Sequence, residues 1–81
     1  MYLISALKKN GQFEHSLSKS RNAMMHLEIK DAKSIEIYDR NGWLLSKAER
    51  DQNGNPHRVK LFLDGEPRQY YKTIFRDLCC Q

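Results

Sequence analysis

The 81-residue sequence has few cysteines, the residues whose disulfides cross-link many small folds. Its two cysteines are neighbours, Cys79 and Cys80, and this spacing strongly disfavours a disulfide between them. They cannot connect distant parts of the chain, which fits a reducing compartment. We therefore expect a cytoplasmic protein.

Spacings typical of metal or catalytic sites are also missing. The cysteines could bind a metal only together with His15, His26 or His57, yet no CxxC or HxxxH spacing occurs. The sequence has no phosphate-binding glycine loop, no HExxH and no GxSxG motif, and its carboxylates show no pattern that would separate acid and base roles. We predict no metal, no cofactor and no enzymatic activity.

Long apolar runs are absent from the sequence, and none approaches the roughly 20 residues of a membrane span. The N-terminal segment MYLISALKKNG places its basic residues after a short apolar stretch, which is the reverse of a secretory signal. We therefore expect no membrane partner.

What the sequence does contain is charge together with a moderate apolar content. Charged residues make up 30% and apolar residues 40%, which is typical of a soluble globular domain, here a single one over residues 1–81. A chain this short buries only about 60 to 65% of the surface that its unfolded form exposes, so its core is thin. The net charge of +4 modestly favours anionic partners.

All four glycines follow Asn or Asp, and such pairs are typical of hairpin turns because both residues tolerate positive φ. The pairs are Asn10-Gly11, Asn41-Gly42, Asn53-Gly54 and Asp64-Gly65. They predict an N-terminal hairpin over residues 1–17 and a three-stranded meander over residues 34–63. The expected strands are 2–9, 12–17, 34–40, 43–50 and 56–63.

A first helix is predicted over residues 18–31. Ser18 and Ser20 are candidate capping residues, and an apolar run follows them. Met25 and the apolar residues after it also alternate with polar ones, so a strand remains possible there.

A second helix is predicted over residues 66–79, where apolar residues recur with a period near 3.6 and Pro67 suits a first helical turn. The complete prediction is an α+β fold with an antiparallel sheet and the element order β-β-α-β-β-β-α. We expect both helices to pack on one face of the sheet.

The Asn-Gly turns also predict the register of the meander. If each forms a two-residue loop, Arg40 faces Trp43 across the first turn, and Lys47 faces Lys60 in the second hairpin. The other expected pairs are Ile35–Ala48, Ile37–Ser46, Asp39–Leu44, Ala48–Val59, Ser46–Leu61 and Leu44–Leu63. Both turns then give one apolar face, which a one-residue slip would scramble. This face holds Ile35, Ile37, Leu44, Ala48, Val59, Leu61 and Leu63.

The opposite face carries basic and aromatic side chains where ordinary surface residues would suffice. Tyr38, Leu45 and Phe62 form a row across its strands. The facing Lys47 and Lys60 repel each other, at a cost on the order of tenths of a kcal/mol, and a nearby anion would relieve this repulsion. We expect this face to contact a partner, unless the N-terminal hairpin or the first helix covers the row. The candidate contact residues are Tyr38, Arg40, Trp43, Lys47, Arg50, Arg58, Lys60 and Phe62.

The C-terminal helix carries a second basic feature. Arg68, Lys72 and Arg76 recur at every fourth residue and form a stripe opposite the apolar side of the helix. A solvated helix surface accounts for such a stripe. As a functional surface, it would suit phosphates or an acidic patch of a protein.

The segment GWLLSKAERDQNGNPHRVKLFLDGEPRQYYKTIFRDL resembles two related DNA-binding modules, the plant ethylene-responsive-factor domain and the arm-binding domain of tyrosine integrases. The resemblance covers residues 34–79 and rests on a Trp after a turn, a basic second strand, an Asn-Gly turn, an apolar third strand and an amphipathic helix. In those families the sheet enters the major groove, which implies DNA contacts at the matching positions here. These positions are Trp43, Lys47, Arg50 and Arg58. Glu36 and Glu49 on the same face depart from the pattern, since carboxylates repel phosphates.

These observations support two hypotheses of different classes. The first is a small non-enzymatic module whose basic, aromatic sheet face engages nucleic acid or a nucleoprotein complex. The second is a mobile-element-type inhibitor that blocks a host defence protein, of the anti-CRISPR or anti-restriction class, with Trp43, Phe62 and Tyr38 as its main contacts. An exposed row on this face could also pair two copies of the chain, but its heavy charge favours a monomer.

Overall fold

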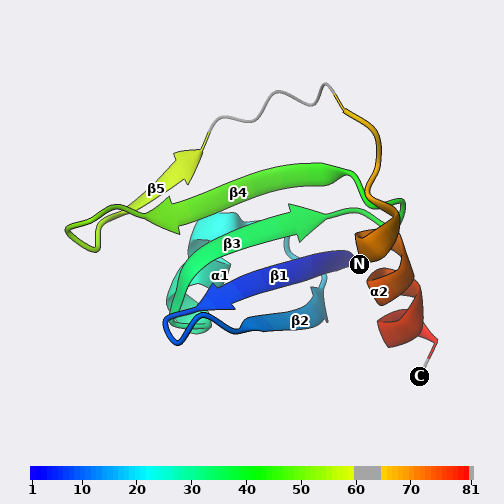
Figure 1. The fold of residues 1–81 in the computed structure, drawn as a ribbon, viewed down its shortest axis with the longest axis horizontal. Coiled ribbons are helices and arrows are strands. Elements are labelled where there is room, and N and C mark those ends of the chain that lie inside the picture. The colour runs from blue at the N-terminus through cyan, green and yellow to red at the C-terminus, as the bar shows by residue number, and fades with distance from the viewer. Residues whose placement is uncertain (60–64, 81) are drawn as a thin grey trace.

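A computed structural model gives the fold of this chain and describes residues 1–59 and 65–80. The elements are β1 (Tyr2–Lys8), β2 (Phe13–Ser18), α1 (Ala23–Ile29), β3 (Ala32–Tyr38), β4 (Leu44–Arg50), β5 (Pro56–Val59) and α2 (Gln69–Cys79). The predicted α+β class and the element order β-β-α-β-β-β-α are confirmed. The strands form an antiparallel sheet in the order β2-β1-β3-β4-β5, so the N-terminal hairpin extends the meander (Figure 1).

Helix α1 is shorter than the predicted 18–31 because its cap lies further along the chain. The Asn22 side chain accepts a hydrogen bond from the Met25 N–H at 3.3 Å and so caps the helix. The two serines that were expected to cap it, Ser18 and Ser20, each accept from the N–H two residues ahead. They therefore shape the turns that lead into the helix.

The Asn-Gly turns are not the predicted two-residue loops. In the β3–β4 turn, the Gly42 N–H donates to the Asp39 carbonyl at 3.1 Å, and the Asp39 N–H donates to the Trp43 carbonyl at 3.0 Å. Gly42 has a φ of 85°, whereas Asp31 is the one non-glycine residue with positive φ in the described segments. A two-residue type I′ turn needs positive φ at both central residues, so this is a longer loop closed by glycine. The β1–β2 and β4–β5 loops show the same hydrogen-bond pattern.

The longer loop shifts the strand register by one residue unless a bulge compensates for it. Between β3 and β4, a bulge between the pairs of Ile37 and Tyr38 compensates for this register shift. The confirmed pairs are Ile35–Ala48 and Ile37–Ser46. Next to the turn, Leu44 faces Tyr38 rather than the predicted Asp39. The predicted pair of Arg40 and Trp43 is also wrong, because the Trp43 carbonyl accepts a hydrogen bond from the Asp39 N–H.

Between β4 and β5 no such irregularity intervenes, and the predicted register is wrong by one residue. Lys47 faces Val59, and Ala48 faces Arg58. Arg58 therefore lies on the face that was expected to be apolar, and Val59 on the face that was expected to be basic. The rest of the predicted third strand lies outside the described residues. It includes Lys60, Leu61, Phe62 and Leu63.

The two helices lie on opposite faces of the sheet, which corrects the prediction that both pack on one face. Along β1, Ile4 packs in the cluster with α1, whereas its neighbour Leu3 packs in the cluster with α2. Figure 1 shows α1 behind the sheet and α2 at the end of the sheet where β1 begins. The α1 cluster consists of Ile4, Ala6, Ala23, Leu27, Ala32, Ile35, Ile37 and Ala48. Packing both faces is a way for a small chain to enlarge a thin core.

The α2 cluster is built around Tyr38 and Phe75. Tyr38 is fully buried and Phe75 is 7% exposed, and burying a large apolar side chain contributes about 1.5 to 3 kcal/mol. Leu3 completes the buried set, and Leu17, Leu44, Tyr71, Ile74 and Leu78 pack around it. Leu44 was expected on the other face, and the turn described above brings it here.

No helix in residues 1–59 and 65–80 has the length and apolar content needed to cross a membrane.

Candidate anion-binding site at the basic end of the sheet

Tyr38, the centre of the predicted contact row, is a core residue. Its ring stacks on the Tyr71 ring of α2, with ring centroids 3.8 Å apart, and its hydroxyl accepts a hydrogen bond from the Arg68 guanidinium at 3.3 Å. Burial, above all, raises the pKa of the Tyr38 phenol well above its usual range. A partner cannot reach this side chain, so the prediction of an exposed row is wrong for Tyr38. The element that covers it is α2, not the N-terminal hairpin or the first helix.

The basic residues of β4 and β5 are engaged within the fold. Arg50 donates to the Ala32 carbonyl at 3.3 Å, to the Gly54 carbonyl at 3.0 Å and to the Glu28 carboxylate at 3.1 Å. It thereby ties α1 and the β4–β5 loop to the sheet. Two other predicted contact residues are also engaged: Lys47 lies 3.9 Å from the Glu49 carboxylate, and Arg58 donates to the Asn22 side chain at 3.3 Å. Lys60 and Phe62 lie outside the described residues.

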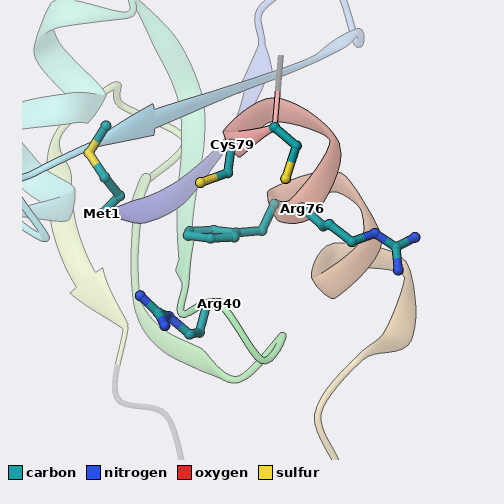
Figure 2. A pocket seen from close by; sticks show the side chains of 6 residues that line it. Met1, Arg40, Arg76 and Cys79 are labelled. Atoms are coloured by element: carbon teal, nitrogen blue, oxygen red, sulfur yellow. The ribbon is translucent and has the colours of Figure 1, made fainter.

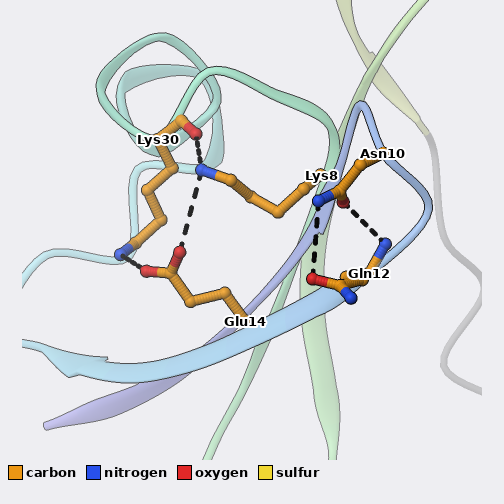
Figure 3. A network of polar contacts seen from close by, with 5 residues as sticks. All are labelled: Lys8, Asn10, Gln12, Glu14 and Lys30. Carbon is orange, nitrogen blue, oxygen red and sulfur yellow. Dashed lines mark hydrogen bonds and ion pairs between the residues drawn. The ribbon is translucent and has the colours of Figure 1, made fainter.

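At the end of the sheet that carries the β1–β2 turn, most of the basic residues form ion pairs with carboxylates. Lys8 and Lys30 converge on Glu14, at 3.7 Å and 3.2 Å (Figure 3). The hydrogen bond and charge of Lys30, and then the charge of Lys8, hold the pKa of the Glu14 carboxyl below its usual value. Lys9 pairs with Asp31 at 2.8 Å in the same way. Three lysines of this end are thus held in ion pairs by two carboxylates, whereas the exposed Lys33 has no ion pair within the described residues.

The middle of the α2-bearing face is not basic either. Glu36 stands opposite Lys47 in the register, and Glu49 contacts both Lys47 and His57. Two carboxylates thus accompany one lysine, and they disfavour an anionic partner.

A close contact between the β3–β4 turn and the start of α2 builds a basic surface at the other end of the sheet. The Arg68 N–H donates to the Gly42 carbonyl at 3.0 Å. Gly42 is required there, since a Cβ atom at this position would lie 2.3 Å from the Arg68 carbonyl oxygen. The contact places Arg40, in the turn, beside the basic stripe of the helix. We call Arg40, Arg68, Lys72 and Arg76 the basic end.

Arg40 and Arg76 line an open hollow of about 320 Å³. Its other lining residues are Met1, Phe75, Cys79 and Cys80. Figure 2 shows the guanidinium groups of Arg40 and Arg76 on different sides of the hollow, with Cys79 on the side of Met1. Two separated guanidinium groups suit successive anionic groups of a polymer better than one small anion.

Positive charge at the basic end is not cancelled by local carboxylates. Within residues 1–59 and 65–80, none of its four members forms an ion pair. Asp39, the nearest carboxylate in the turn, accepts the backbone N–H groups of Asn41 at 2.9 Å and Trp43 at 3.0 Å. Trp43 is half-buried in this turn. The structure thus joins Arg40 and Trp43 of the predicted sheet site with the predicted helix stripe.

A second surface, which the sequence did not predict, is aromatic. Phe13 and His15 of β2 lie with parallel rings, and His15 contacts Tyr70 and Tyr71 of α2 edge-on. Phe13 is 57% exposed and Tyr70 is 64% exposed. Burial lowers the pKa of His15. The spacing of Phe13 and His15, two apart in a strand, indicated a shared face, but their approach to α2 depends on the tertiary fold.

No group of three or more His, Cys, Asp or Glu side chains in the described part of the chain is placed to hold a metal ion. Comparisons of the chain with protein-family models, with curated proteins and with solved structures find no match. Function is therefore argued from the site itself.

Proposed function

We propose that this protein is a small non-enzymatic module that binds the phosphate backbone of a nucleic acid through its basic end. The observation that carries the proposal is the docking of the β3–β4 turn onto α2, which gathers cations from two distant segments. Within the described residues none of these cations has an ion-pair partner. Arg40, Lys72 and Arg76 can therefore bind a phosphate without losing an internal ion pair, whereas Arg68 also donates a hydrogen bond to the Tyr38 hydroxyl.

The proposed contact differs from the one that the DNA-binding resemblance implies. The resemblance assigns DNA contacts to the middle of the sheet, where Glu36 and Glu49 lie among the basic side chains. Arg50 and Arg58 are also occupied by internal hydrogen bonds. At the basic end only Arg68 has a side-chain hydrogen bond of this kind within the described residues, to Tyr38. Arg40, Lys72 and Arg76 have neither such a bond nor an ion pair there, and for this reason we place the nucleic acid at the basic end.

The salt dependence of binding tests the proposal. On duplex DNA, each phosphate contact contributes about 0.9 to the slope of log affinity against log salt. The double variant Arg40→Ala with Arg76→Ala should therefore bind more weakly, with a slope lower by about 1.8. Binding is measured by anisotropy of a labelled duplex and of a labelled single strand over a range of salt concentrations.

A matched control removes the same charge from the opposite end of the sheet. Lys9 lies in the β1–β2 turn and Lys33 lies near the start of β3, and both are exposed. Lys9→Ala with Lys33→Ala should leave the slope close to that of the wild type. Equal losses in the two double variants would show a general charge effect and would contradict a site at the basic end. An absence of binding to DNA and RNA at low salt would refute the whole proposal.

The exposed aromatic surface favours a second candidate function, the inhibitor of a host defence protein. Interface hot spots are enriched in large aromatic residues, and Phe13 and Tyr70 are exposed side by side with His15. Tyr38, one of the hot spots expected from the sequence, is buried and cannot contact a target. The inhibitor would then use Phe13 and Tyr70.

Affinity capture from a host lysate, with and without nuclease, separates the two candidates. A direct protein target survives nuclease treatment, and Phe13→Ser with Tyr70→Ser should abolish its capture. Ile29→Ser is the matched control, because Ile29 is 70% exposed on α1, on the other side of the sheet. Capture that depends on nucleic acid, or that is unchanged in the aromatic variant, counts against the inhibitor.

We also propose that the protein is a monomer and is located in the cytoplasm. Burial of Tyr38 beneath α2 supports a monomer, because it removes part of the patch that a homodimer would use. The exposed thiols of Cys79 and Cys80 are compatible with a reducing compartment. Sedimentation equilibrium with thiols reduced tests the oligomeric state, and a dimer at micromolar concentration would overturn this part.

A further inference from the structure

The hollow at the basic end combines thiols with positive charge. Cys79 and Cys80 are exposed and line the hollow together with Arg40 and Arg76. Reactive cysteines lie in electropositive, accessible surroundings, and this hollow provides both conditions. Its volume of about 320 Å³ lies at the lower end of the range for small-molecule sites.

We infer that this hollow is a thiol-modification site at which Cys79 captures low-molecular-weight disulfides that carry carboxylates. Figure 2 shows the Cys79 side chain pointing toward Met1, with the Arg40 guanidinium on the same side of the hollow and that of Arg76 directed away. Arg40 therefore attracts the carboxylates of the incoming molecule, and Cys79 supplies the nucleophile.

The reaction is a thiol–disulfide exchange. The Cys79 thiol loses its proton to solvent, and the thiolate sulfur attacks one sulfur of the incoming disulfide. A new sulfur–sulfur bond forms, the old one breaks, and the electron pair leaves with the released half as a thiolate. Cys79 is oxidised and the released half is reduced, so the incoming disulfide is the oxidant and no other co-reactant is needed.

The neighbouring thiol cannot readily resolve this adduct. If Cys80 attacked the mixed disulfide, it would form a bond between adjacent residues, whose Cα atoms lie about 3.8 Å apart. Disulfides usually join residues with Cα atoms about 4.4 to 6.8 Å apart, so such a bond is strained. The mixed disulfide therefore persists until an external thiol removes it.

Modification would also regulate binding, a consequence that rests on the proposed function. The adduct brings carboxylates next to Arg40, where a phosphate of the nucleic acid would bind. DNA affinity should fall, with a salt slope lower by about 0.9, the contribution of one phosphate contact.

Reaction rates of single-cysteine variants test the inference. Cys80→Ser keeps Cys79, and Cys79→Ser keeps Cys80 as an internal control in the same hollow. Each is treated with dianionic 5,5′-dithiobis(2-nitrobenzoate) and with neutral 4,4′-dithiodipyridine, and the ratio of the two rates removes differences in accessibility. The rate with the dianionic reagent divided by the rate with the neutral reagent should be about threefold higher for Cys79 than for Cys80. This difference should disappear near 1 M salt, where the Debye length is about 3 Å.

The source of the attraction is tested by a matched pair of charge variants in the Cys79-only protein. Arg40→Gln should remove the anionic preference, whereas Lys33→Gln, at the far end of the sheet, should keep it. Equal ratios for the two thiols, or a ratio that Arg40→Gln leaves unchanged, would overturn the inference. With oxidised glutathione as the probe, mass spectrometry should find one adduct at Cys79 and no loss of two hydrogens from an internal disulfide.

The kinetic test does not depend on nucleic acid, so the two proposals can fail separately. Anionic preference at Cys79 without any DNA binding would retain the modification site and reject the proposed function. DNA binding that depends on Arg40 and Arg76, without the preference at Cys79, would retain the function and reject the modification site.

Discussion

The ring of Tyr38 lies against the ring of Tyr71, with centroids 3.8 Å apart and planes inclined by 12°. This contact joins the end of β3 to the first turn of α2 and closes the α2-bearing face at this end of the sheet. The Arg68 guanidinium donates a hydrogen bond to the Tyr38 hydroxyl and lies over the Tyr71 ring. The same contact that buries an expected binding residue therefore also positions part of the basic end.

Burial of Tyr38 predicts a loss of stability in alkaline solution. The raised pKa keeps this phenol protonated in the folded protein, whereas in the unfolded chain it ionises near its ordinary value of 10.0. Its contribution to stability is thus complete below about pH 10 and is lost as the pH rises further, by up to about 1.4 kcal/mol per pH unit. Urea unfolding of the wild type and of Tyr38→Phe between about pH 8 and pH 11 measures this loss.

The Phe variant separates Tyr38 from other groups that titrate in this range. It keeps the stacked ring and removes the ionisable hydroxyl, so its stability should decline less steeply above about pH 10. Parallel declines in the two proteins would contradict the assignment of this effect to Tyr38.

The turn glycines provide a second prediction. Gly42 and Gly54 have nearly equal φ values, 85° and 84°, but a Cβ atom would clash with the Arg68 carbonyl only at Gly42. Gly54→Ala should cost about 1 to 2 kcal/mol for the left-handed backbone alone. Gly42→Ala should cost about 1 to 3 kcal/mol more, because the turn must also move away from α2. Chemical denaturation measures both values, and equal costs would show that the docking contact is absent.

The same turns show how far the sequence predicts the fold. Asn-Gly pairs located the hairpins correctly, and the 3.6-residue period located α2. The register depended on loop length, and the overlooked signal was the Asp at the start of Asp39-Arg40-Asn41-Gly42 and of Asp51-Gln52-Asn53-Gly54. Asp at the first position and Gly at the fourth favour a type I turn, and glycine then closes a three-residue loop. The Asp51 carboxylate accepts the N–H groups of Asn53 and Asn55 in this manner.

The bulge in β4 and the position of α2 had no comparable local signal. The bulge restores the register between β3 and β4 but has no counterpart between β4 and β5. The face that α2 covers depends on Tyr38 and Leu3, which are brought together by the pairing of strands that are distant in sequence. The basic stripe of α2 was visible in the sequence, but its approach to Arg40 was not, because it requires the tertiary contact at Gly42.

The carboxylate of Glu14 predicts a loss of stability in acid. Its pKa is lowered from the ordinary value of 4.5, first through the hydrogen bond from Lys30. The stabilisation is therefore present above that value and is lost as the pH falls through the lower pKa of the folded state. Glu14→Gln should be less stable than the wild type at neutral pH, and the difference should shrink in acid.

Unfolding curves at a series of acidic pH values measure this difference for Glu14. Glu66→Gln is the control, because Glu66 is exposed and has no ion pair within residues 1–59 and 65–80. If the free energies of unfolding of Glu14→Gln and the wild type differ by the same amount at all pH values, the ionised carboxylate makes no contribution.

Trp43 is the single tryptophan of the chain, and its fluorescence reports the charge of the basic end. It is half-buried in the turn that carries Arg40, so a quencher reaches part of its ring. Positive charge nearby concentrates anions, so iodide should quench Trp43 more strongly, relative to neutral acrylamide, than it does in a variant that lacks this charge. The iodide-to-acrylamide ratio should fall by about 1.5- to 2-fold in Arg40→Gln and remain unchanged in Lys33→Gln. A ratio that is equal in all three proteins would show that Arg40 does not set the local potential, and the placement of a phosphate beside it would then lose its electrostatic basis.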